Sequence, residues 1–361
     1  MFFINPTIQL GKLIRLCFGS FSEEKLKQDL RDFFFYDTVL LTDSGRSALA
    51  AIIISLGLEG KTIALPAYIC DVLYPILTKY NISPIFLDVN TQTFQPDLSE
   101  YKKRIHRNVD AVLLCHTYGK KVPSSVYTYL QNKNIKIIED CAHCVDFTII
   151  KPKNQEKLAD AIYFSLPKIC PAPNGGIALI RKSKGRVHIG KDTIHISHIK
   201  QILHILPSFH LLILFIKRVF RINNLANPIF SSIKKPWTIS LKIFHNHLPI
   251  LLKKGIVQNF NSFPYCFPIM QKDPIALKKK LQKHGIFAER IWNDPITHNP
   301  GVQKKYDIHT KDFPHTKEIA KTILCLPLRN IKNNAQLKKY TQKLQHLLPK
   351  DSTHIWNNPQ R

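Results

Sequence analysis

Short apolar segments rich in branched residues alternate with helical patterns along the first half of the chain, and this alternation constrains the fold more than any other feature. Six segments are expected to be strands: residues 62–65, 84–89, 111–117, 136–140, 161–166 and 176–181. Helical patterns such as residues 71–80 and 124–132 separate the first four. The alternation predicts a largely parallel sheet covered on both faces. The loops after its strands should gather at one edge, where open sheets bind ligands.

Two ionisable residues follow strands of this predicted sheet. Lys168 is expected in a loop between two strand-like segments, and Asp140 ends the strand before them. A lysine amine in a partly desolvated cleft can form an imine with the aldehyde of pyridoxal 5'-phosphate (PLP), while a carboxylate keeps the pyridine nitrogen of that cofactor protonated. Each residue alone is weak evidence, because most loop lysines are solvated and most strand-end aspartates are caps. Together they indicate a PLP enzyme.

A third feature could bind the cofactor phosphate. Ser44, Gly45 and Arg46 form a turn that opens a predicted helix with an apolar face. The first backbone N–H groups of a helix lack partners within it, so they can bind an anion. An ordinary helix cap is the alternative. Arg46 favours the anion site, because a guanidinium at a helix start opposes the dipole unless an anion compensates it.

Taken in order, the motifs of the chain resemble those of the DegT/DnrJ/EryC1/StrS family of PLP-dependent sugar aminotransferases. The matching segments are residues 44–49, 63–68, 86–89, 116–119, 139–143, 164–176, 285–292 and 324–328. The resemblance implies the aspartate aminotransferase-like fold of fold-type-I PLP transferases. Because 361 residues exceed what one core usually supports, two domains are expected.

We expect residues 1–252 to form the large PLP-binding domain, with an irregular, helix-rich part at 183–252. Residues 253–361 should form a smaller α/β domain. Its predicted elements are a strand at 263–269 and helices at 274–284 and 335–348.

The resemblance also implies roles for single residues. Lys168 would hold the cofactor and then move a proton, and Asp140 would protonate the pyridine nitrogen. The other expected cofactor contacts are His143 at the ring hydroxyl and Ser44, Gly45, Arg46 and Ser165 at the phosphate. The family position for the aromatic that stacks on the ring aligns best with Cys70, which leaves Tyr68 as the nearby candidate. His116 is a weaker candidate for the ring region, and a packed strand-end histidine is the alternative.

The chain departs from the family pattern at several positions. Arg46, His143 and Asn174 stand where the family usually has Thr, Gln and Glu. An Asn-x-Arg segment that contacts the neighbouring subunit's cofactor in the family is not found, and residues 221–225 are a poor substitute. An impaired member that binds a sugar nucleotide or acts as a regulator is therefore one alternative. A PLP-dependent deoxysugar dehydratase is another, but that branch replaces the lysine, so Lys168 favours transamination.

The resemblance implies a nucleotide-linked keto-sugar as substrate, glutamate as amino donor, surface polysaccharide as destination and a homodimer as the assembly. The chain has 52 Lys and Arg against 25 Asp and Glu, a net charge of +27. Compositional bias explains the excess best, followed by attraction to an anionic substrate or membrane surface. Specific nucleic-acid binding is not expected, since the basic residues are scattered and no recognised module is present.

The eight cysteines lie singly apart from Cys141 and Cys144. No second pair completes a zinc site, so we expect free thiols, no metal and a reducing cytoplasm. The most apolar run, residues 202–216, is shorter than the roughly 20 residues that span a bilayer. No span is expected. Core or dimer packing accounts for this run better than peripheral contact with an anionic membrane.

Overall fold

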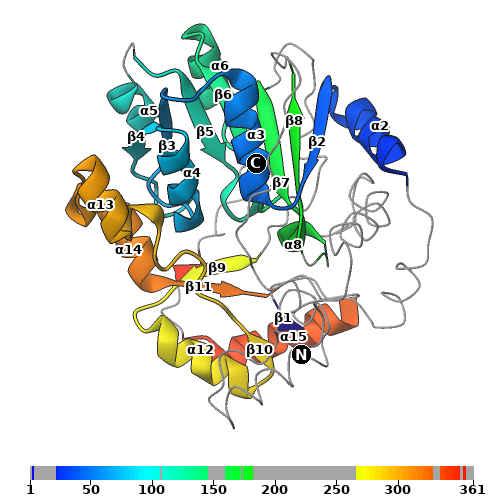
Figure 1. The fold of residues 1–361 in the computed structure, drawn as a ribbon. Coiled ribbons are helices and arrows are strands. Elements are labelled where there is room, and N and C mark those ends of the chain that lie inside the picture. Colours follow the sequence, from blue (N-terminus) through cyan, green and yellow to red (C-terminus); the bar gives the residue numbers. More distant parts are fainter. Residues whose placement is uncertain are drawn as a thin grey trace, which may run out of the picture.

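A computed structural model describes residues 2–3, 22–105, 108–144, 159–170, 172, 174–181, 266–327, 334–349 and 353–354. Its main feature is a seven-stranded sheet with the strand order β2-β8-β7-β6-β5-β3-β4 (Figure 1). The strands are β2 (Thr38–Thr42), β3 (Thr62–Pro66), β4 (Ser83–Leu87), β5 (Ala111–Cys115), β6 (Lys136–Asp140), β7 (Ala161–Ser165) and β8 (Gly176–Ile180). The neighbouring strands β4, β3, β5, β6 and β7 pair in parallel. Strand β8 is antiparallel to both of its neighbours, β7 and β2.

Helices cover both faces of this sheet. The large-domain helices are α2 (Glu23–Phe34), α3 (Gly45–Leu56), α4 (Tyr74–Lys79), α5 (Leu98–Arg104), α6 (Ser124–Asn132) and the single turn α8 (Leu166–Ile169), with short η1 (Asp71–Leu73) and η2 (Thr117–Gly119). Strand side chains alternate between two cores: Val112 and Leu114 join α2, α5 and α6, whereas Leu113 joins α3 and α4. This period-two burial is what a sheet covered on both faces requires.

A second, smaller sheet has the order β11-β9-β12. Its strands are β9 (Phe267–Met270), β11 (Ile323–Leu326) and β12 (Thr353–His354), and β1 (Phe2–Phe3) pairs separately with β10 (Ile286–Phe287). The helices of this part are α12 (Pro274–Lys283), η4 (Ile296–His298), α13 (Pro300–Tyr306), η5 (Thr310–Asp312), α14 (Pro314–Thr322) and α15 (Asn334–Leu347). The two parts share a core, because Ile296, Val302 and Phe313 pack with α3 and α4. Among the described residues, no helix is both long and apolar enough to cross a bilayer.

The structure confirms the predicted α/β class and places a strand at each of the six expected segments. Helices 274–284 and 335–348 appear as α12 and α15, and β9 covers the described end of the strand expected at 263–269. Strand β2 and helices α2 and α5 were not predicted. The expectations for 183–252, including the run 202–216 and segment 221–225, lie outside the described residues. The exact domain boundary stays a prediction.

The prediction that Lys168 lies in a loop is wrong. Lys168 lies in α8, a single helical turn closed by a hydrogen bond of 2.9 Å from the Cys170 N–H to the Leu166 carbonyl. Pro167 occupies the first turn of this helix, where its missing N–H leaves no donor unsatisfied. The turn therefore fixes the backbone of the lysine instead of leaving it in an open loop.

Candidate active site

The sheet topology brings distant segments together at one edge. Strands β6 and β7 are parallel, so Asp140 and Ser165 end at the same edge. Strand β2 runs in the same direction as β7 because both are antiparallel to β8, and the turn after Thr42 therefore reaches this edge as well. The first residue of β8, Gly176, lies there too. A cavity of about 330 Å³ opens at this edge.

Most of the predicted site residues line this cavity. Its wall contains Asp43, Ser44, Gly45, Arg46, Cys70, Val72, Leu73, Asp140, Ala142, Tyr163, Ser165, Pro167, Lys168, Asn174, Gly175 and Trp292. Six of the predicted residues, Ser44, Gly45, Arg46, Asp140, Ser165 and Lys168, are thus brought together. Asn174, one of the departures from the family pattern, also lines the wall.

Helix α3 begins at the cavity. Ser44 caps it, with the Ser44 hydroxyl accepting a hydrogen bond of 3.2 Å from the Ser47 N–H. The first turn contains no acidic residue, and Arg46 lies in it beside the cavity. The first backbone N–H groups of a helix, a hydroxyl and a guanidinium gathered at one helix start are groups that can bind a phosphate.

Two glycines allow the α3 turn to approach the lysine turn. Gly175 has φ +113°, and its N–H donates a hydrogen bond of 2.7 Å to the Asp43 carbonyl. A Cβ at Gly175 would meet Leu166 Cδ1 at 2.7 Å, and a Cβ at Gly176 would overlap the Ser44 carbonyl. Only glycine at both positions lets the phosphate turn and α8 lie this close together.

Lys168 lies on the cavity wall and faces His143, which is not among the lining residues. Lys168 Nζ lies 3.5 Å from His143 Nε2, and Lys168 itself is half-buried. His143 is 2% exposed, and burial, reinforced by the charge of Lys168, holds the pKa of His143 well below its usual value. His143 is therefore a neutral imidazole beside the amine.

Asp140 is held by the turn that follows β6. The Ala142 N–H donates a hydrogen bond of 2.9 Å to Asp140 Oδ1, which fixes the direction of the buried carboxylate. Tyr163 lies opposite Asp140 on β7. Burial raises the pKa of Tyr163 well above its usual value, and the Asp140 charge raises it further. Sequence reasoning gave Tyr163 no role, although it directly precedes the motif that contains Lys168.

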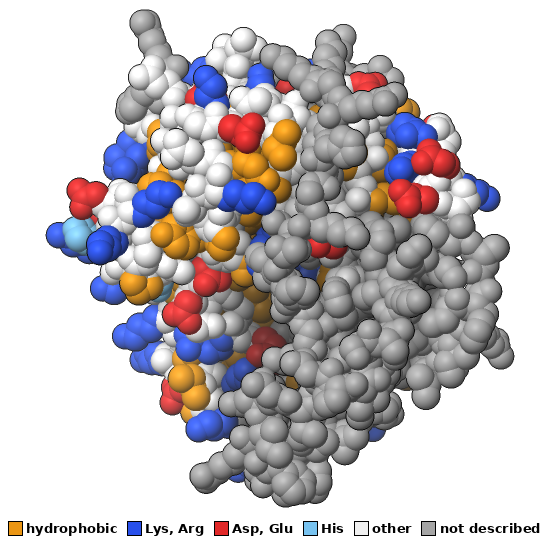
Figure 2. Space-filling view, in the orientation of Figure 1, with side chains coloured by type: hydrophobic (Ala, Val, Ile, Leu, Met, Phe, Trp, Pro, Cys, Tyr) orange, Lys and Arg blue, Asp and Glu red, His pale blue; other side chains and the backbone are white. Residues whose placement is uncertain are grey.

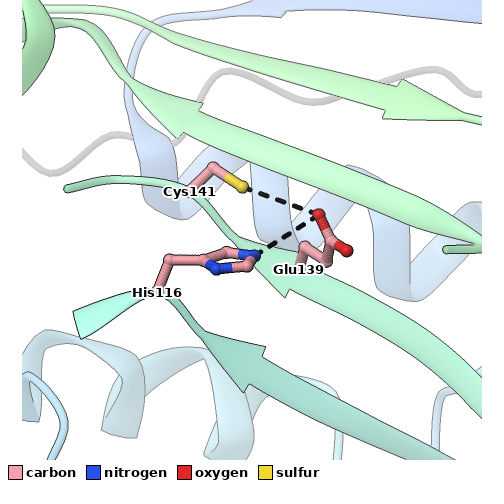
Figure 3. Close-up of side chains that lie close together, drawn as sticks. All are labelled: His116, Glu139 and Cys141. Carbon is pink, nitrogen blue, oxygen red and sulfur yellow. Dashed lines mark hydrogen bonds and ion pairs between the residues drawn. The ribbon is translucent and has the colours of Figure 1, made fainter. Parts of the chain in front are cut away.

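His116 belongs to a different, buried cluster that also contains Glu139 and Cys141. Figure 3 shows His116 and Cys141 pointing toward the Glu139 carboxylate. His116 Nε2 lies 3.5 Å from Glu139 Oε2, and the Tyr127 hydroxyl donates a hydrogen bond of 2.6 Å to Glu139 Oε1. Burial by itself lowers the pKa of His116, but nearby Cys144 and Glu139 overcome this effect and raise it to about 9.

His116 is not among the cavity-lining residues, and its Nε2 faces the Glu139 carboxylate. The Val122 N–H points at His116 Nδ1 over 3.3 Å, a weak contact that is given up when the ring is protonated. Of the two expectations for His116, the geometry favours the packed strand-end histidine.

The aromatic wall differs from the expected one. Tyr68 is fully buried, and its hydroxyl contacts the Tyr118 hydroxyl at 2.7 Å and the Ile291 carbonyl at 3.0 Å. Cys70 lines the cavity, as does Trp292, whose indole lies 4.7 Å from the His143 ring at an interplanar angle of 25°. Sequence reasoning quoted Trp292 only as the end of a small-domain motif. Its place in the cavity depends on how the two parts of the chain pack.

The site fits PLP. The phosphate turn, the Asp140 carboxylate and the Lys168 amine converge on one cavity large enough for a small molecule, and the glycine pair keeps the phosphate turn next to the lysine. On a mostly parallel α/β sheet, this arrangement defines a fold-type-I PLP enzyme.

Comparison with known proteins defines the family. Residues 16–168 and 245–345 match the DegT/DnrJ/EryC1/StrS aminotransferase family, and the chain belongs to it. The protein is thus a PLP-dependent aminotransferase. A curated relative, the dTDP-4-amino-4,6-dideoxy-D-glucose transaminase of Escherichia coli, is 22% identical over 341 residues, which cover 90% of both chains. The GDP-perosamine synthase of Escherichia coli O157:H7 is 30% identical over 104 residues, 27% of this chain and 28% of the relative.

Solved structures confirm the fold. A Helicobacter pylori aminotransferase involved in the biosynthesis of pseudoaminic acid superposes with a TM-score of 0.64 at 14% identity, over 96% of this chain and 98% of that protein. The Escherichia coli GDP-4-keto-6-deoxy-D-mannose-3-dehydratase, solved with bound hydrated PLP, gives a TM-score of 0.62 at 15% identity, over 94% and 95% of the two chains.

Proposed function

We propose that the protein transfers an amino group from glutamate to a nucleotide-linked keto-sugar that is used for surface polysaccharide. The observation that carries the proposal is the convergence of Lys168, Asp140 and the α3 phosphate turn on one cavity. The names of two relatives, a dTDP-amino-sugar transaminase and a GDP-perosamine synthase, support a nucleotide-linked sugar as the substrate class.

Each residue has a distinct part in this proposal. PLP supplies an electron sink that stabilises negative charge on the carbon that gains or loses the amino group. Asp140 keeps the pyridine nitrogen protonated, and the Lys168 amine attaches the cofactor and afterwards carries the proton to and from the reacting carbon. Ser44, Gly45, Arg46 and Ser165 hold the phosphate, and His143 Nε2 donates toward the ring hydroxyl.

Lys168 also bears on the alternative dehydratase reaction. The family resemblance implies that the dehydratase branch replaces the attaching lysine, whereas transamination uses the lysine in each half-reaction. Lys168 lies in the cavity, 3.5 Å from His143, where it can serve both halves. The proposal is therefore amino-group transfer.

Absorbance spectroscopy tests the proposal. The purified protein should bind added PLP and show a visible band that Lys168→Ala abolishes. Asp140→Ala should keep part of the band but lose at least about 100-fold in kcat, because the ring nitrogen is no longer held protonated. A protein that stays colourless with added PLP would refute the proposal, and normal turnover by Asp140→Ala would refute the role of that carboxylate.

We further propose that the protein works in the cytoplasm as a homodimer in which the site lies near the subunit interface. The implied sugar nucleotide and glutamate are cytoplasmic metabolites, and free thiols such as Cys115 and Cys325 suit a reducing compartment. Light scattering at micromolar concentration should give twice the mass of the 41.6 kDa chain. A monomer would contradict the assembly and leave the cofactor proposal intact.

A further inference from the structure

We propose that Trp292 is a specificity-determining residue against whose indole the sugar ring of the substrate packs, an inference that rests on the proposed function. Its ring lies on the cavity wall and is contributed by the segment after β10, outside the large-domain strands that hold the cofactor-binding residues.

The backbone of Trp292 is fixed in an unusual conformation. Its φ is +57°, in the left-handed region that bulky residues rarely adopt. The preceding carbonyl, that of Ile291, accepts hydrogen bonds from the hydroxyls of Tyr68 and Tyr118 at 3.0 and 3.3 Å. Strained residues persist where their surroundings hold them and tend to occur at binding sites. These two buried hydroxyls supply such a restraint next to Trp292.

Neighbouring rings hold the indole in place. Trp292 stacks on His143 with 4.7 Å between centroids and meets Tyr68 edge-on at 5.6 Å and 72°. Tyr118 lies 6.1 Å away at 26°. Aromatic pairs at such distances and angles stabilise each other beyond their buried area. The indole is therefore a rigid wall of the cavity and not a mobile surface side chain.

The distance between Lys168 and Trp292 indicates where the substrate would lie relative to the indole. Lys168 Nζ lies 5.9 Å from the Trp292 centroid. The carbonyl carbon of a keto-sugar has to come next to the atom that Lys168 serves, so the remainder of a six-membered ring extends along the cavity wall. Elsewhere on the cavity wall, Cys70, Val72 and Leu73 offer a thiol and two aliphatic side chains. Trp292 thus offers a large flat apolar surface close to the lysine.

The chemistry of a sugar ring suits this surface. One face of a pyranose presents C–H groups, which pack on an aromatic ring, while its hydroxyls point outward to polar partners. A bound acceptor would therefore place its C–H face on the indole. Glutamate has no such ring, so the contact should affect one half-reaction and not the other.

Variants of Trp292 test the inference through this asymmetry. With PLP-loaded protein and dTDP-, UDP- and GDP-linked 4-keto-6-deoxyhexoses as acceptors, Trp292→Leu should raise the KM of the accepted keto-sugar about tenfold or more, and Trp292→Phe about threefold. The KM for glutamate and the Kd for PLP, read from the visible band, should change less than about twofold. A structural role would move all three quantities together.

Tryptophan emission gives a readout that needs no turnover. The chain has three tryptophans, Trp237, Trp292 and Trp356. Addition of the accepted sugar nucleotide to the protein should change the emission of the wild type, Trp237→Phe and Trp356→Phe, and leave that of Trp292→Phe unchanged. Because phenylalanine keeps an aromatic ring at the site, Trp292→Phe should also melt within a few degrees of the wild type.

The outcomes separate this inference from the proposed function. A wild type that binds no PLP would contradict the aminotransferase proposal, whereas the emission titration would still test Trp292. Sugar-nucleotide binding without an emission change from Trp292 would overturn the inference. So would a Trp292→Leu protein that binds PLP less tightly but keeps the wild-type KM for the keto-sugar, because the indole would then serve the cofactor.

Discussion

At the scale of single residues, the chemistry of the turn after β6 depends on which nitrogen of His143 carries the proton. The Tyr118 N–H donates to His143 Nδ1 over 3.2 Å. A neutral imidazole that accepts at Nδ1 has its proton on Nε2, the atom 3.5 Å from Lys168 Nζ. Because burial and Lys168 keep the pKa of His143 low, this arrangement persists at acidic pH. His143 thus presents one fixed N–H donor to the site.

A glutamine can replace that donor, and this gives the first prediction. We expect His143→Gln to keep kcat within about tenfold of the wild type and His143→Leu to lose about 100-fold, since only glutamine retains an N–H. Between about pH 5.5 and 7.5 the kcat profiles of the wild type and His143→Gln should run parallel, because His143 does not titrate there. An inflection near pH 6.5 that disappears in His143→Gln would show that His143 becomes protonated in the working enzyme.

The buried pair of His116 and Glu139 predicts how stability depends on pH. The pKa of His116 is about 9 in the folded protein, above the ordinary value of 6.5. A raised pKa means that the folded state binds the proton more tightly. The stability that protonated His116 contributes to the folded state is therefore fully present below about pH 6.5 and is lost as the pH rises through about 9.

Urea unfolding of Glu139→Gln should show this loss. The variant should be less stable than the wild type by on the order of 3 kcal/mol at about pH 6, and the difference should shrink toward about pH 9.5. Tyr127→Phe is the control, because it removes the 2.6 Å hydrogen bond to Glu139 without removing the charge. Its destabilisation should change little with pH. A difference for Glu139→Gln that grows with pH would contradict the proton assignment of His116.

At the scale of elements, the start of β8 joins the two halves of the cofactor site. Gly176 pairs with Thr42, and Gly175 forms an isolated bridge to Ser44. The Leu166 N–H donates a hydrogen bond of 2.9 Å to the Gly175 carbonyl. One dipeptide therefore holds both the α3 turn and α8, and the distance between phosphate and lysine depends on it.

We expect Gly176→Ala to break this junction. The added Cβ would overlap backbone atoms of Ser44 and Gly45, which cannot rotate away as a flexible side chain could. The variant should bind PLP at least about tenfold more weakly, because the phosphate turn and the lysine turn have to separate. Gly60→Ala is the matched control: it has φ +69° with nothing within 4 Å, so it should cost about 1 kcal/mol of stability and leave PLP affinity unchanged.

The secondary-structure elements also show how much of the fold could be predicted from the sequence. Strands β3 to β8 were predictable, because each is a short apolar run bounded by turns and both of its faces are buried. The position of β2 was not, since its antiparallel pairing with β8 is a contact between residues far apart in the chain. The same applies to the site: Lys168 and Asp140 follow strands, whereas Trp292 enters the cavity only through the packing of a distant segment.

At the scale of the whole molecule, Asp88 attaches the smaller part to the large sheet. This residue directly follows β4, and its carboxylate accepts hydrogen bonds from the His315 N–H at 3.1 Å and from the Thr316 N–H and hydroxyl at 2.9 and 2.7 Å. It therefore serves as the N-terminal cap of α14 from across the domain junction. Helix α14 leads directly into β11, so this cap helps to set the face that the smaller part presents to the cavity.

Among the described residues, the positive charge is spread over the surface visible in Figure 2 and not gathered in one patch. On the face shown in Figure 2, the described lysine and arginine side chains are scattered among acidic and apolar ones. Helix α12 has the basic residues Lys280 and Lys283 in its last turn, where they complement the helix dipole. Only Arg46 and Lys168 place a formal positive charge on the cavity wall among the residues described there. The other described basic side chains do not line this wall, and they would act on a substrate through the long-range field.

A net charge of +27 should attract a diphosphate sugar, and salt should weaken that attraction. We expect the KM for the nucleotide-linked keto-sugar to rise about fivefold between about 50 and 300 mM NaCl, because the field that steers and holds the anion is screened. The matched control is the same keto-sugar without its nucleotide, whose KM should not respond to salt. If both acceptors respond equally, the salt acts on the protein and not on the diphosphate. If neither responds, the positive charge has no part in substrate binding and reflects composition alone.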